Sequence, residues 1–385
     1  MADYTTLTTS AELPRIPSIS ASQALRAAPS SAPSSLSTSA VPTGLERLDD
    51  AIASLGEGVD RGLPRGHVTE IYGPPGVGKT ALMMSAAVEA LKDGQRVVWI
   101  DTGSPIPTPR LKALLTASVT TSNKSDPKEV EAIYEKMETL FSHFRTPSLP
   151  HLLALLVRPP PSFPPNGTTL LIIDSISAPF QPYFPHASEL KARLAGQSSI
   201  PQQTQWLLHR KWNVTSDLAN HLVKLAAARR IAVVVLNQTH TRIKGQPRPT
   251  LFPALAGGSW ESCVYARVVV YRDLAPLGLD DGDQKQEGGL RRVRYAEVMK
   301  RGGRVISVRT DENIVAFVIE NDGLRELSAH PLSSTSKTSL PPPSSIPLPI
   351  SVRKRKAEEV ADSEGEEDFL DEDGDELNDF GLEDN

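Results

Sequence analysis

The residues of this 385-residue chain best suited to chemistry lie between Gly73 and Thr80, where the sequence reads Gly-Pro-Pro-Gly-Val-Gly-Lys-Thr. This is a complete Walker A pattern, in which glycines let backbone N–H groups curve around phosphate oxygens. A strand pattern precedes it and a helical pattern follows it, which disfavours the alternative of an ordinary glycine-rich turn. The residues predicted to hold ATP are Gly73, Pro74, Pro75, Gly76, Val77, Gly78, Lys79 and Thr80.

Thr80 and Asp174 are the predicted ligands of Mg²⁺. In Walker sites the lysine reaches the outer phosphates, and the hydroxyl that follows it binds the metal ion. Asp174 ends the apolar run Leu-Leu-Ile-Ile-Asp at 170–174, so a strand would deliver its carboxylate near the metal. The alternative is a plain aspartate at a strand end, but the position after a Walker A pattern favours the metal role.

Short apolar runs alternate with helical patterns between about 41 and 330, which predicts an α/β domain with a central, mostly parallel sheet. Continuous apolar runs such as 169–174 and 231–236 suit parallel strands covered on both faces. Later runs at 264–271, 293–298 and 314–320 are expected to be antiparallel strands at the sheet edge. The other expected elements are strands at 67–72, 97–100 and 141–145 and helices at 80–92, 149–157 and 216–230.

The flanks of this domain have the composition of segments that do not fold. Residues 1–40 are rich in Ser, Ala, Thr and Pro, and 331–352 form a Pro/Ser linker, so both are predicted to be disordered. Residues 353–385 hold a basic cluster, Arg-Lys-Arg-Lys at 353–356, and a self-repelling acidic tail. That last segment carries 4 basic and 15 acidic residues, which leaves the rest of the chain mildly basic although the net charge is −5.

The composition also excludes several classes of protein. The single cysteine, Cys263, excludes an internal disulfide and a multi-cysteine zinc site, and it fits a small buried hydrophobe better than a redox thiol. No window of about 18 apolar residues occurs, so no membrane span is expected. The N-terminus lacks the basic start and apolar run of a secretory signal.

The order of motifs resembles that of RecA-like recombinases. Thr-Gly-Leu-Glu-Arg-Leu-Asp at 43–49, Gly-Leu-Pro-Arg-Gly at 62–66 and Val-Thr-Glu-Ile-Tyr-Gly at 68–73 are similar to the family's entry into Walker A. Leu-Leu-Ile-Ile-Asp-Ser-Ile and Leu-Asn-Gln at 236–238 follow in the family's order. The resemblance runs from about 42 to 325 and is greatest to the accessory paralogues of the eukaryotic strand-exchange recombinase. It implies a RecA-like P-loop ATPase core, binding of ATP and Mg²⁺, contact with single-stranded DNA, and recombinase partner subunits.

One departure from the family concerns catalysis. Where family recombinases have a glutamate that activates the attacking water, this chain reads Ile-Asp-Thr-Gly-Ser at 100–104, which places Gly103 there. A general base commonly contributes a factor of about 10² to 10⁴ in rate. We therefore expect ATP binding with slow or negligible turnover. The alternative is that Asp101, two residues back on the same strand face, substitutes for the glutamate.

Two further residues take candidate roles from the resemblance. Arg110 lies where the family stacks an arginine on adenine, and the alternative is a solvated arginine at a helix start. Gln238 follows a buried strand as the family's γ-phosphate sensor does, because a neutral amide can donate to a phosphate oxygen. The alternative for Gln238 is a cap at a strand end.

The segment 239–258 lies where RecA-like proteins have their second DNA-binding loop. Arg242, Lys244 and Arg248 are the candidate contacts to single-stranded DNA, because spaced cations can follow a phosphate backbone. A solvated surface loop is the alternative. The helical DNA-binding module that precedes the core in full recombinases has no counterpart in residues 1–40, so strand exchange by this chain alone is not expected.

The leading hypothesis is therefore an accessory, ATP-binding recombinase paralogue of homologous recombination. It would join another paralogue and the main recombinase on single-stranded DNA in the nucleus, where the cluster at 353–356 resembles an import signal. That cluster also fits a chance grouping in a linker. The alternatives are a catalytically silent scaffold with a structural nucleotide and an unrelated P-loop phosphotransferase.

Overall fold

A computed structural model of the chain describes residues 40–53, 61–103, 105–122, 135, 137–184, 200–242, 250–276 and 290–327. The predicted N-terminal tail, Pro/Ser linker, basic cluster and acidic tail lie outside these residues. The limits proposed for those segments stay predictions.

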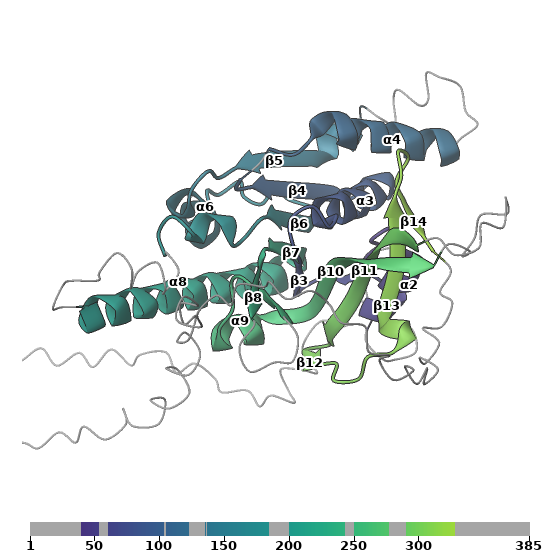
Figure 1. Ribbon diagram of the computed structural model, residues 1–385. Coiled ribbons are helices and arrows are strands. Elements are labelled where there is room, and N and C mark those ends of the chain that lie inside the picture. The colour runs from purple at the N-terminus through teal and green to yellow at the C-terminus, as the bar shows by residue number, and fades with distance from the viewer. Residues whose placement is uncertain are drawn as a thin grey trace, which may run out of the picture. The chain divides into compact units, whose positions relative to one another are not determined.

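A ten-stranded sheet forms the centre of the described chain, in the order β14-β13-β11-β10-β3-β7-β6-β4-β5 with β12 beside β11 (Figure 1). The strands from β10 to β5 run parallel, and β11, β13 and β14 continue the sheet with antiparallel pairings. This confirms the predicted α/β class with an antiparallel edge. The strands are β3 (Val68–Tyr72), β4 (Arg96–Asp101), β5 (Phe141–Arg145), β6 (Thr168–Asp174), β7 (Ala232–Asn237), β10 (Val264–Pro276), β11 (Leu290–Arg301), β12 (Arg304–Val305), β13 (Ile314–Ile319) and β14 (Leu324–Glu326).

Helices cover both faces of the sheet, which explains why its central strands are mostly apolar. On one face α2 (Glu46–Ile52), α3 (Lys79–Lys92) and α4 (Thr108–Ser122) share a core with Trp99 and Ile172. On the other face α6 (Leu149–Val157), α8 (Ile200–Arg229) and α9 (Gly258–Cys263) share a core with Ile100 and Ile173. None of the described helices has the length and hydropathy needed to cross a bilayer.

The structure adds elements that the sequence patterns did not delimit. Helix α8 begins well before the predicted helix at 216–230, and the predicted loop at 239–258 contains an antiparallel pair, β8 (Thr239–Arg242) with β9 (Thr250–Pro253). A second small pair joins β1 (Ala40–Val41) to β2 (Leu63–Pro64). The described fold is therefore the predicted core with these additional elements.

Asp49 of α2 connects this helix to the segment that precedes it at the start of the core. Its carboxylate accepts a hydrogen bond of 2.8 Å from the Thr43 backbone N–H, and its side chain lies in helix α2 almost out of contact with water. Burial raises the pKa of Asp49 to about 7, although the hydrogen bonds from Thr43 act in the opposite direction. The folded protein therefore holds a proton here that the unfolded chain releases near pH 4.

This raised pKa predicts a pH-dependent stability. Its contribution is complete below about pH 4 and is lost as the pH rises towards 7, at up to about 1.4 kcal/mol per pH unit. In Asp49→Asn the free energy of unfolding should lack this decline between pH 5 and 7. Denaturant titrations at several pH values measure the slope. Asp50→Asn, at the exposed neighbour that pairs with Arg61, should keep the wild-type slope. Equal slopes in wild type and Asp49→Asn would contradict the assignment.

Candidate nucleotide site

The Walker A turn lies at the carboxyl edge of the parallel strands, between the end of β3 and the start of α3. This is the edge at which open α/β sheets bind ligands. Gly78 immediately before the helix has φ +114°, a conformation that side chains with a Cβ rarely adopt. A Cβ added there would also stand 2.9 Å from Ile319 Cδ1. The turn therefore requires glycine at this position on two counts.

Lys79 and Thr80 both lie at the turn, where they contact other members of the predicted site. The Lys79 ammonium donates to the backbone oxygens of Gly73 at 2.6 Å and Pro74 at 3.0 Å, so it lies over the turn. The Thr80 hydroxyl donates to Asp174 Oδ2 at 2.7 Å. The structure thus brings together the two predicted ligands of Mg²⁺, which lie 94 positions apart in the chain.

The electrostatics of the site depend mainly on burial. Burial raises the pKa of the Asp174 carboxyl, against the Thr80 hydrogen bond and the nearby Lys79 charge. Burial likewise lowers the pKa of the Lys79 ammonium, and the Asp174 carboxylate opposes that shift. A divalent cation placed against Asp174 would favour its ionised form.

Thr80 and Asp174 suit Mg²⁺ because both present hard oxygen donors. Mg²⁺ usually takes one or two protein oxygens and completes its shell with phosphates and water. Within the described part of the chain, no group of three or more His, Cys, Asp and Glu side chains could hold a metal ion without such help. These two residues would therefore hold Mg²⁺ together with a bound triphosphate.

Gly103 follows β4 at the same edge of the sheet and faces open space. A Cβ built on Gly103 would meet no atom of the described residues within 4 Å, and its backbone is not in the left-handed region. The position that carries a base in the resembling family therefore has room for a side chain here.

Asp101 is held by other groups. It is buried, pairs across the sheet with Asp174 and contacts His143 Nε2 at 2.5 Å. Its other oxygen has no hydrogen-bond partner, and Arg145 Nε lies 3.9 Å from it. Its hydrogen bond to His143 disfavours the alternative that Asp101 acts as the base.

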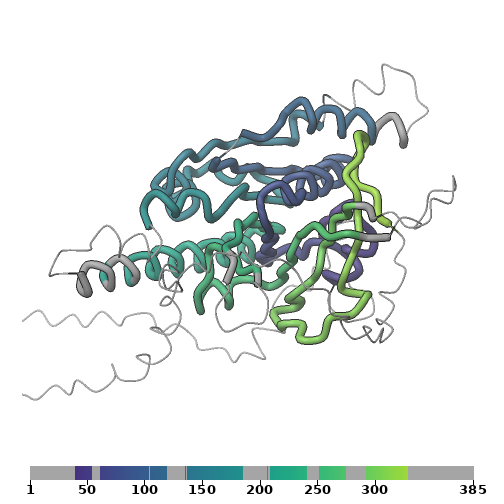
Figure 2. Tube along the Cα trace, viewed as in Figure 1, coloured from purple at the N-terminus to yellow at the C-terminus, as the bar shows by residue number. Residues whose placement is uncertain are grey.

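Arg110 connects two parts of the fold beside the turn. Its guanidinium donates to the backbone oxygens of Asn321, at 2.5 Å, and Glu320. The tube in Figure 2 shows the connection between β13 and β14 close to α4, and Arg110 lies in the first turn of that helix. A role for Arg110 in stacking on adenine stays a prediction.

Asn237 and Gln238, at the end of β7, have different surroundings. Asn237 is fully buried, whereas Gln238 is half-buried and its backbone N–H donates to Ser177 Oγ at 2.9 Å. The Gln238 side-chain oxygen lies 3.5 Å from the Gln181 amide. The sensor role of Gln238 stays a prediction.

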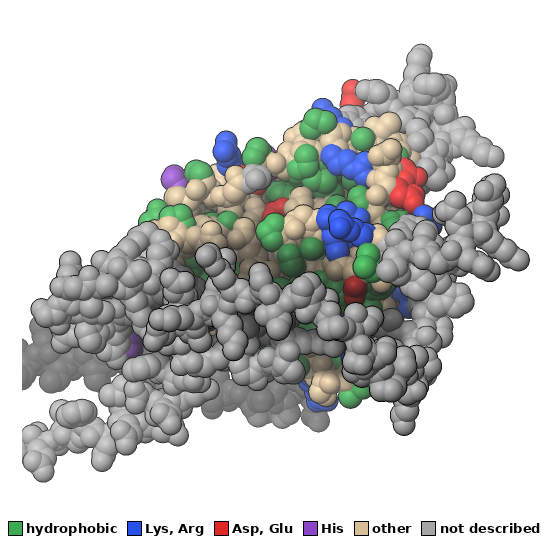
Figure 3. Space-filling model, viewed as in Figure 1, with side chains coloured by type: hydrophobic (Ala, Val, Ile, Leu, Met, Phe, Trp, Pro, Cys, Tyr) green, Lys and Arg blue, Asp and Glu red, His purple; other side chains and the backbone are tan. Residues whose placement is uncertain are grey.

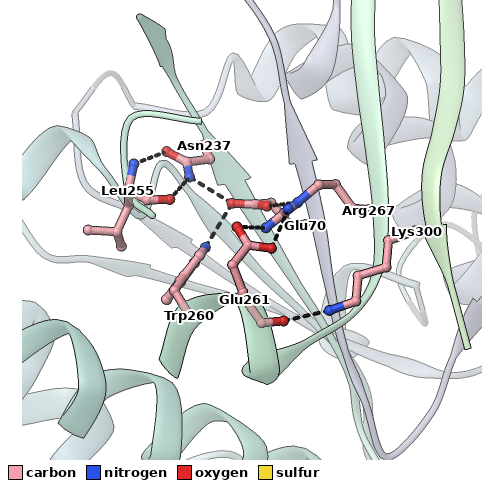
Figure 4. A network of polar contacts seen from close by, with 7 residues as sticks. All are labelled: Glu70, Asn237, Leu255, Trp260, Glu261, Arg267 and Lys300. Carbon is pink, nitrogen blue, oxygen red and sulfur yellow. Dashed lines mark hydrogen bonds and ion pairs between the residues drawn. The ribbon is translucent and has the colours of Figure 1, made fainter. Parts of the chain in front are cut away.

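Asn237 belongs to a buried polar network centred on Glu70 of β3 (Figure 4). The Asn237 amide donates to Glu70 at 2.7 Å and to Leu255 O at 2.9 Å, and accepts from Leu255 N at 3.2 Å. Glu70 also accepts from the Trp260 indole at 2.9 Å and from Arg267 Nε at 2.5 Å. The carboxylate is thus satisfied by one cation and two neutral donors, which offsets the cost of burying it.

This network fixes both ends of the segment between Gln238 and Ala254. Ala254 N–H donates to Gln238 O at 2.8 Å, next to the bonds between Asn237 and Leu255. Arg267 extends the network to Glu261, whose backbone oxygen accepts from Lys300 at 2.5 Å. Sequence analysis did not identify Glu70 as part of a site. The only signal was a charged residue inside an otherwise apolar strand.

The predicted DNA contacts lie at the margin of the described chain. Arg242 ends β8, while Lys244 and Arg248 lie outside the described residues. On the face in Figure 3, the described Lys and Arg side chains stand in separate groups among hydrophobic and other residues. A role for these three residues in binding DNA stays a prediction.

Cys263 ends α9 as a buried thiol, which confirms its interpretation as a small hydrophobe. Burial raises the pKa of the Cys263 thiol to about 12, so it is protonated at neutral pH.

A Walker A turn joined by a hydrogen bond to a strand-end aspartate is the arrangement found in P-loop proteins. Comparison with protein-family profiles matches residues 30–143 to the RecA N-terminal domain. DNA repair protein rhp55 of Schizosaccharomyces pombe is 24% identical over 75% of this chain and 88% of its own length. DNA repair protein RAD51 homolog 3 of Cricetulus griseus is 27% identical over 72% of this chain and 68% of its own. The crystal structure of the RadB recombinase matches 74% of this chain and 98% of its own, with a TM-score of 0.45 and 18% identity.

The chain is homologous to the DNA repair proteins rhp55 and RAD51 homolog 3, and its residues 30–143 match the RecA N-terminal domain, which supports a place among recombinase paralogues of the RecA type. The family resemblance seen in the sequence motifs is thereby confirmed.

The Glu70 network predicts the effect of an isosteric change, Asn237→Asp. The new carboxylate would face Glu70 at the present 2.7 Å contact, so the two groups must share a proton or repel. We expect the free energy of unfolding at pH 7 to fall by about 3 kcal/mol. The loss should be smaller at pH 5, because a raised carboxyl pKa in the folded state adds stability as the pH falls.

Denaturant unfolding at both pH values measures this effect. Asn213→Asp, on the exposed surface of α8, is the matched control and should change stability by less than about 0.5 kcal/mol. A loss of the same size at pH 5 and pH 7 would show that the two carboxylates do not interact.

Proposed function

We propose that this protein is an accessory recombinase paralogue of homologous recombination repair that binds ATP with Mg²⁺ and hydrolyses it slowly or not at all. The observation that carries the proposal is the 2.7 Å hydrogen bond from Thr80 to Asp174 beside a vacant side-chain position at Gly103. The groups needed to hold a triphosphate are assembled, while the position for a water-activating carboxylate has no side chain.

Each part of the site has a separate task in this proposal. The turn's backbone N–H groups and Lys79 hold the phosphates, and Thr80 and Asp174 hold Mg²⁺, which neutralises phosphate charge. Gln238 senses the γ-phosphate, at the root of the segment that leads to Arg242, Lys244 and Arg248. Loss of a general base lowers the rate of ATP hydrolysis by a factor of about 10² to 10⁴. It leaves the affinity for ATP largely unchanged. The nucleotide then acts mainly as a ligand that favours one assembly state.

The proposed assembly joins this chain to a second recombinase paralogue and to the main recombinase on single-stranded DNA in the nucleus. Both relatives compared above are DNA repair proteins by name. A subunit with slow turnover would keep its nucleotide during filament assembly. Affinity purification from cells after DNA damage tests this part: recovery of recombinase subunits supports it, and recovery of metabolic enzymes alone contradicts it.

A catalytically silent scaffold is the second candidate, because the vacancy at Gly103 fits it equally well. In a scaffold the nucleotide is needed only for folding or not at all. Dependence of partner binding on the bound nucleotide separates the two candidates.

Restoring the missing carboxylate is the first test. Gly103→Glu introduces a side chain where no atom of the described residues lies within 4 Å of the new Cβ, so the fold should be unchanged. We expect steady-state ATP hydrolysis by the full-length chain, with its partner present, to rise about tenfold or more. Gly103→Gln is the isosteric control and should not raise the rate, since an amide is not a base. An equal rise in both variants would contradict the proposed cause.

Removing the phosphate-binding cation is the second test. Lys79→Ala should weaken ATP binding at least about tenfold, measured by calorimetry with Mg²⁺. Lys92→Ala, at the other end of α3, removes an exposed ion pair with Glu89 and should bind ATP like the wild type. Partner capture lost together with ATP binding supports the assembly role, whereas capture that survives in Lys79→Ala supports the scaffold.

A further inference from the structure

Two arginines lie side by side behind the Walker A turn, outside the set of residues assigned to the nucleotide above. Arg272 belongs to β10 and Arg294 to β11, and they are direct partners in the antiparallel ladder. Side chains paired in this way have Cβ atoms about 4.5–5.5 Å apart, and like charges so placed destabilise a sheet.

Both guanidinium groups reach the turn. Arg272 Nη2 donates a hydrogen bond to the backbone oxygen of Gly76. The Arg294 Cδ and Nε atoms lie 3.3 and 3.4 Å from the point where a Cβ on Gly78 would stand. The pair therefore lies against the turn on the side of β10 and β11, with Arg272 bound to Gly76 and Arg294 beside Gly78.

No anion in the described part of the chain balances this charge. Neither guanidinium forms an ion pair there, and Arg294 Nε is buried without a hydrogen-bond partner. Burial and the neighbouring Arg272 charge lower the pKa of the Arg294 guanidinium. Two cations held together beside a phosphate-binding turn form a site with an excess of positive charge.

The hydrogen bond to Gly76 also orients the turn itself. A trans peptide group is planar, so its N–H points away from its C=O. With the Gly76 oxygen held by Arg272, the Val77 N–H points to the opposite side, away from the arginine. The guanidinium thus fixes one of the N–H groups that the Walker A pattern offers to phosphate.

We propose that Arg272 and Arg294 form a positioning pair for the triphosphate, which orients the Walker A turn and whose mutual repulsion is relieved when polyphosphate binds. This inference rests on the proposed ATP-binding function and adds to it a source of affinity in the same subunit. Because binding and relief of repulsion are coupled, the pair should lower the stability of the nucleotide-free protein and raise its affinity for ATP.

The experiment compares Arg294→Gln, Arg272→Gln and the charge-conserving Arg294→Lys in the full-length chain. Calorimetry gives the Kd for ATP with Mg²⁺, and thermal unfolding without nucleotide gives the stability. We expect each glutamine variant to bind ATP about tenfold more weakly, a typical size for a coupling effect. Without nucleotide, the melting temperature of Arg294→Gln should equal or exceed that of the wild type. Arg294→Lys should bind ATP within about threefold of the wild type, because it keeps the charge.

If Arg294 had only a structural role, its replacement by glutamine would lower the melting temperature. A melting temperature of Arg294→Gln below the wild type, or an equal loss of affinity in Arg294→Lys, would overturn the proposal. Arg304→Gln, at an exposed arginine of β12 on the same sheet, is the matched control and should match the wild type in both measurements.

The proposed ATP-binding function and the proposed role of the arginine pair can be refuted separately. Wild-type protein that binds no ATP would refute the proposed function itself. Wild-type protein that binds ATP, together with glutamine variants that bind it equally well, would refute only the arginine pair.

Discussion

The hydrogen bond between Thr80 and Asp174 is the contact on which the rest of the site depends. It joins the first turn of α3 to the last residue of β6, 94 positions apart in the chain. Only the parallel register of β3, β7 and β6 brings these two ends to one edge of the sheet. That register depends in turn on helices covering both faces, because strands of this apolar character are unstable if either face meets water.

Strand β3 carries two polar functions within a few residues. Glu70 in its interior anchors the network that closes the segment after β7, and Gly73 beyond its end opens the phosphate-binding turn. The neighbouring β10 repeats this arrangement, with Arg267 bound to Glu70 and Arg272 bound to Gly76. A displacement of β3 relative to β10 would therefore alter both places at once. The two strands therefore connect the Walker A turn directly to the segment that follows β7.

Local sequence patterns were sufficient for the continuous apolar runs and for two further elements. The runs at 169–174 and 231–236 became β6 and β7 with shifts of one residue, and 141–145 and 149–157 became β5 and α6 without any shift. The patterns did not reveal β8 and β9, which lie among prolines and polar residues. They also did not reveal the early start of α8, which carries the exposed Trp206 and Trp212 ahead of the predicted helix.

The residues of the site likewise fall into two groups, those that a sequence motif identifies and those that only the fold brings together. A contiguous motif identifies Lys79 and Thr80, because its chemistry is written in adjacent residues. The partners of Glu70 lie 167 to 197 positions away along the chain, so no spacing rule could group them. The opposition of Arg272 to Arg294 likewise follows only from the strand register. The sequence alone does not predict which strands pair, because tertiary packing decides the pairing.

The four tryptophans of this chain fall into two optical classes. Trp99 and Trp260 are fully buried, whereas Trp206 and Trp212 of α8 are 58% and 48% exposed. An ionic quencher dissolved in the buffer would extinguish the emission of the second class and spare the first. The surviving fluorescence would include that of Trp260, whose indole N–H is bound to Glu70. Trp260 can therefore serve as an intrinsic fluorescent probe of its contact with Glu70 of β3. Changes at that contact can be followed in real time without chemical modification.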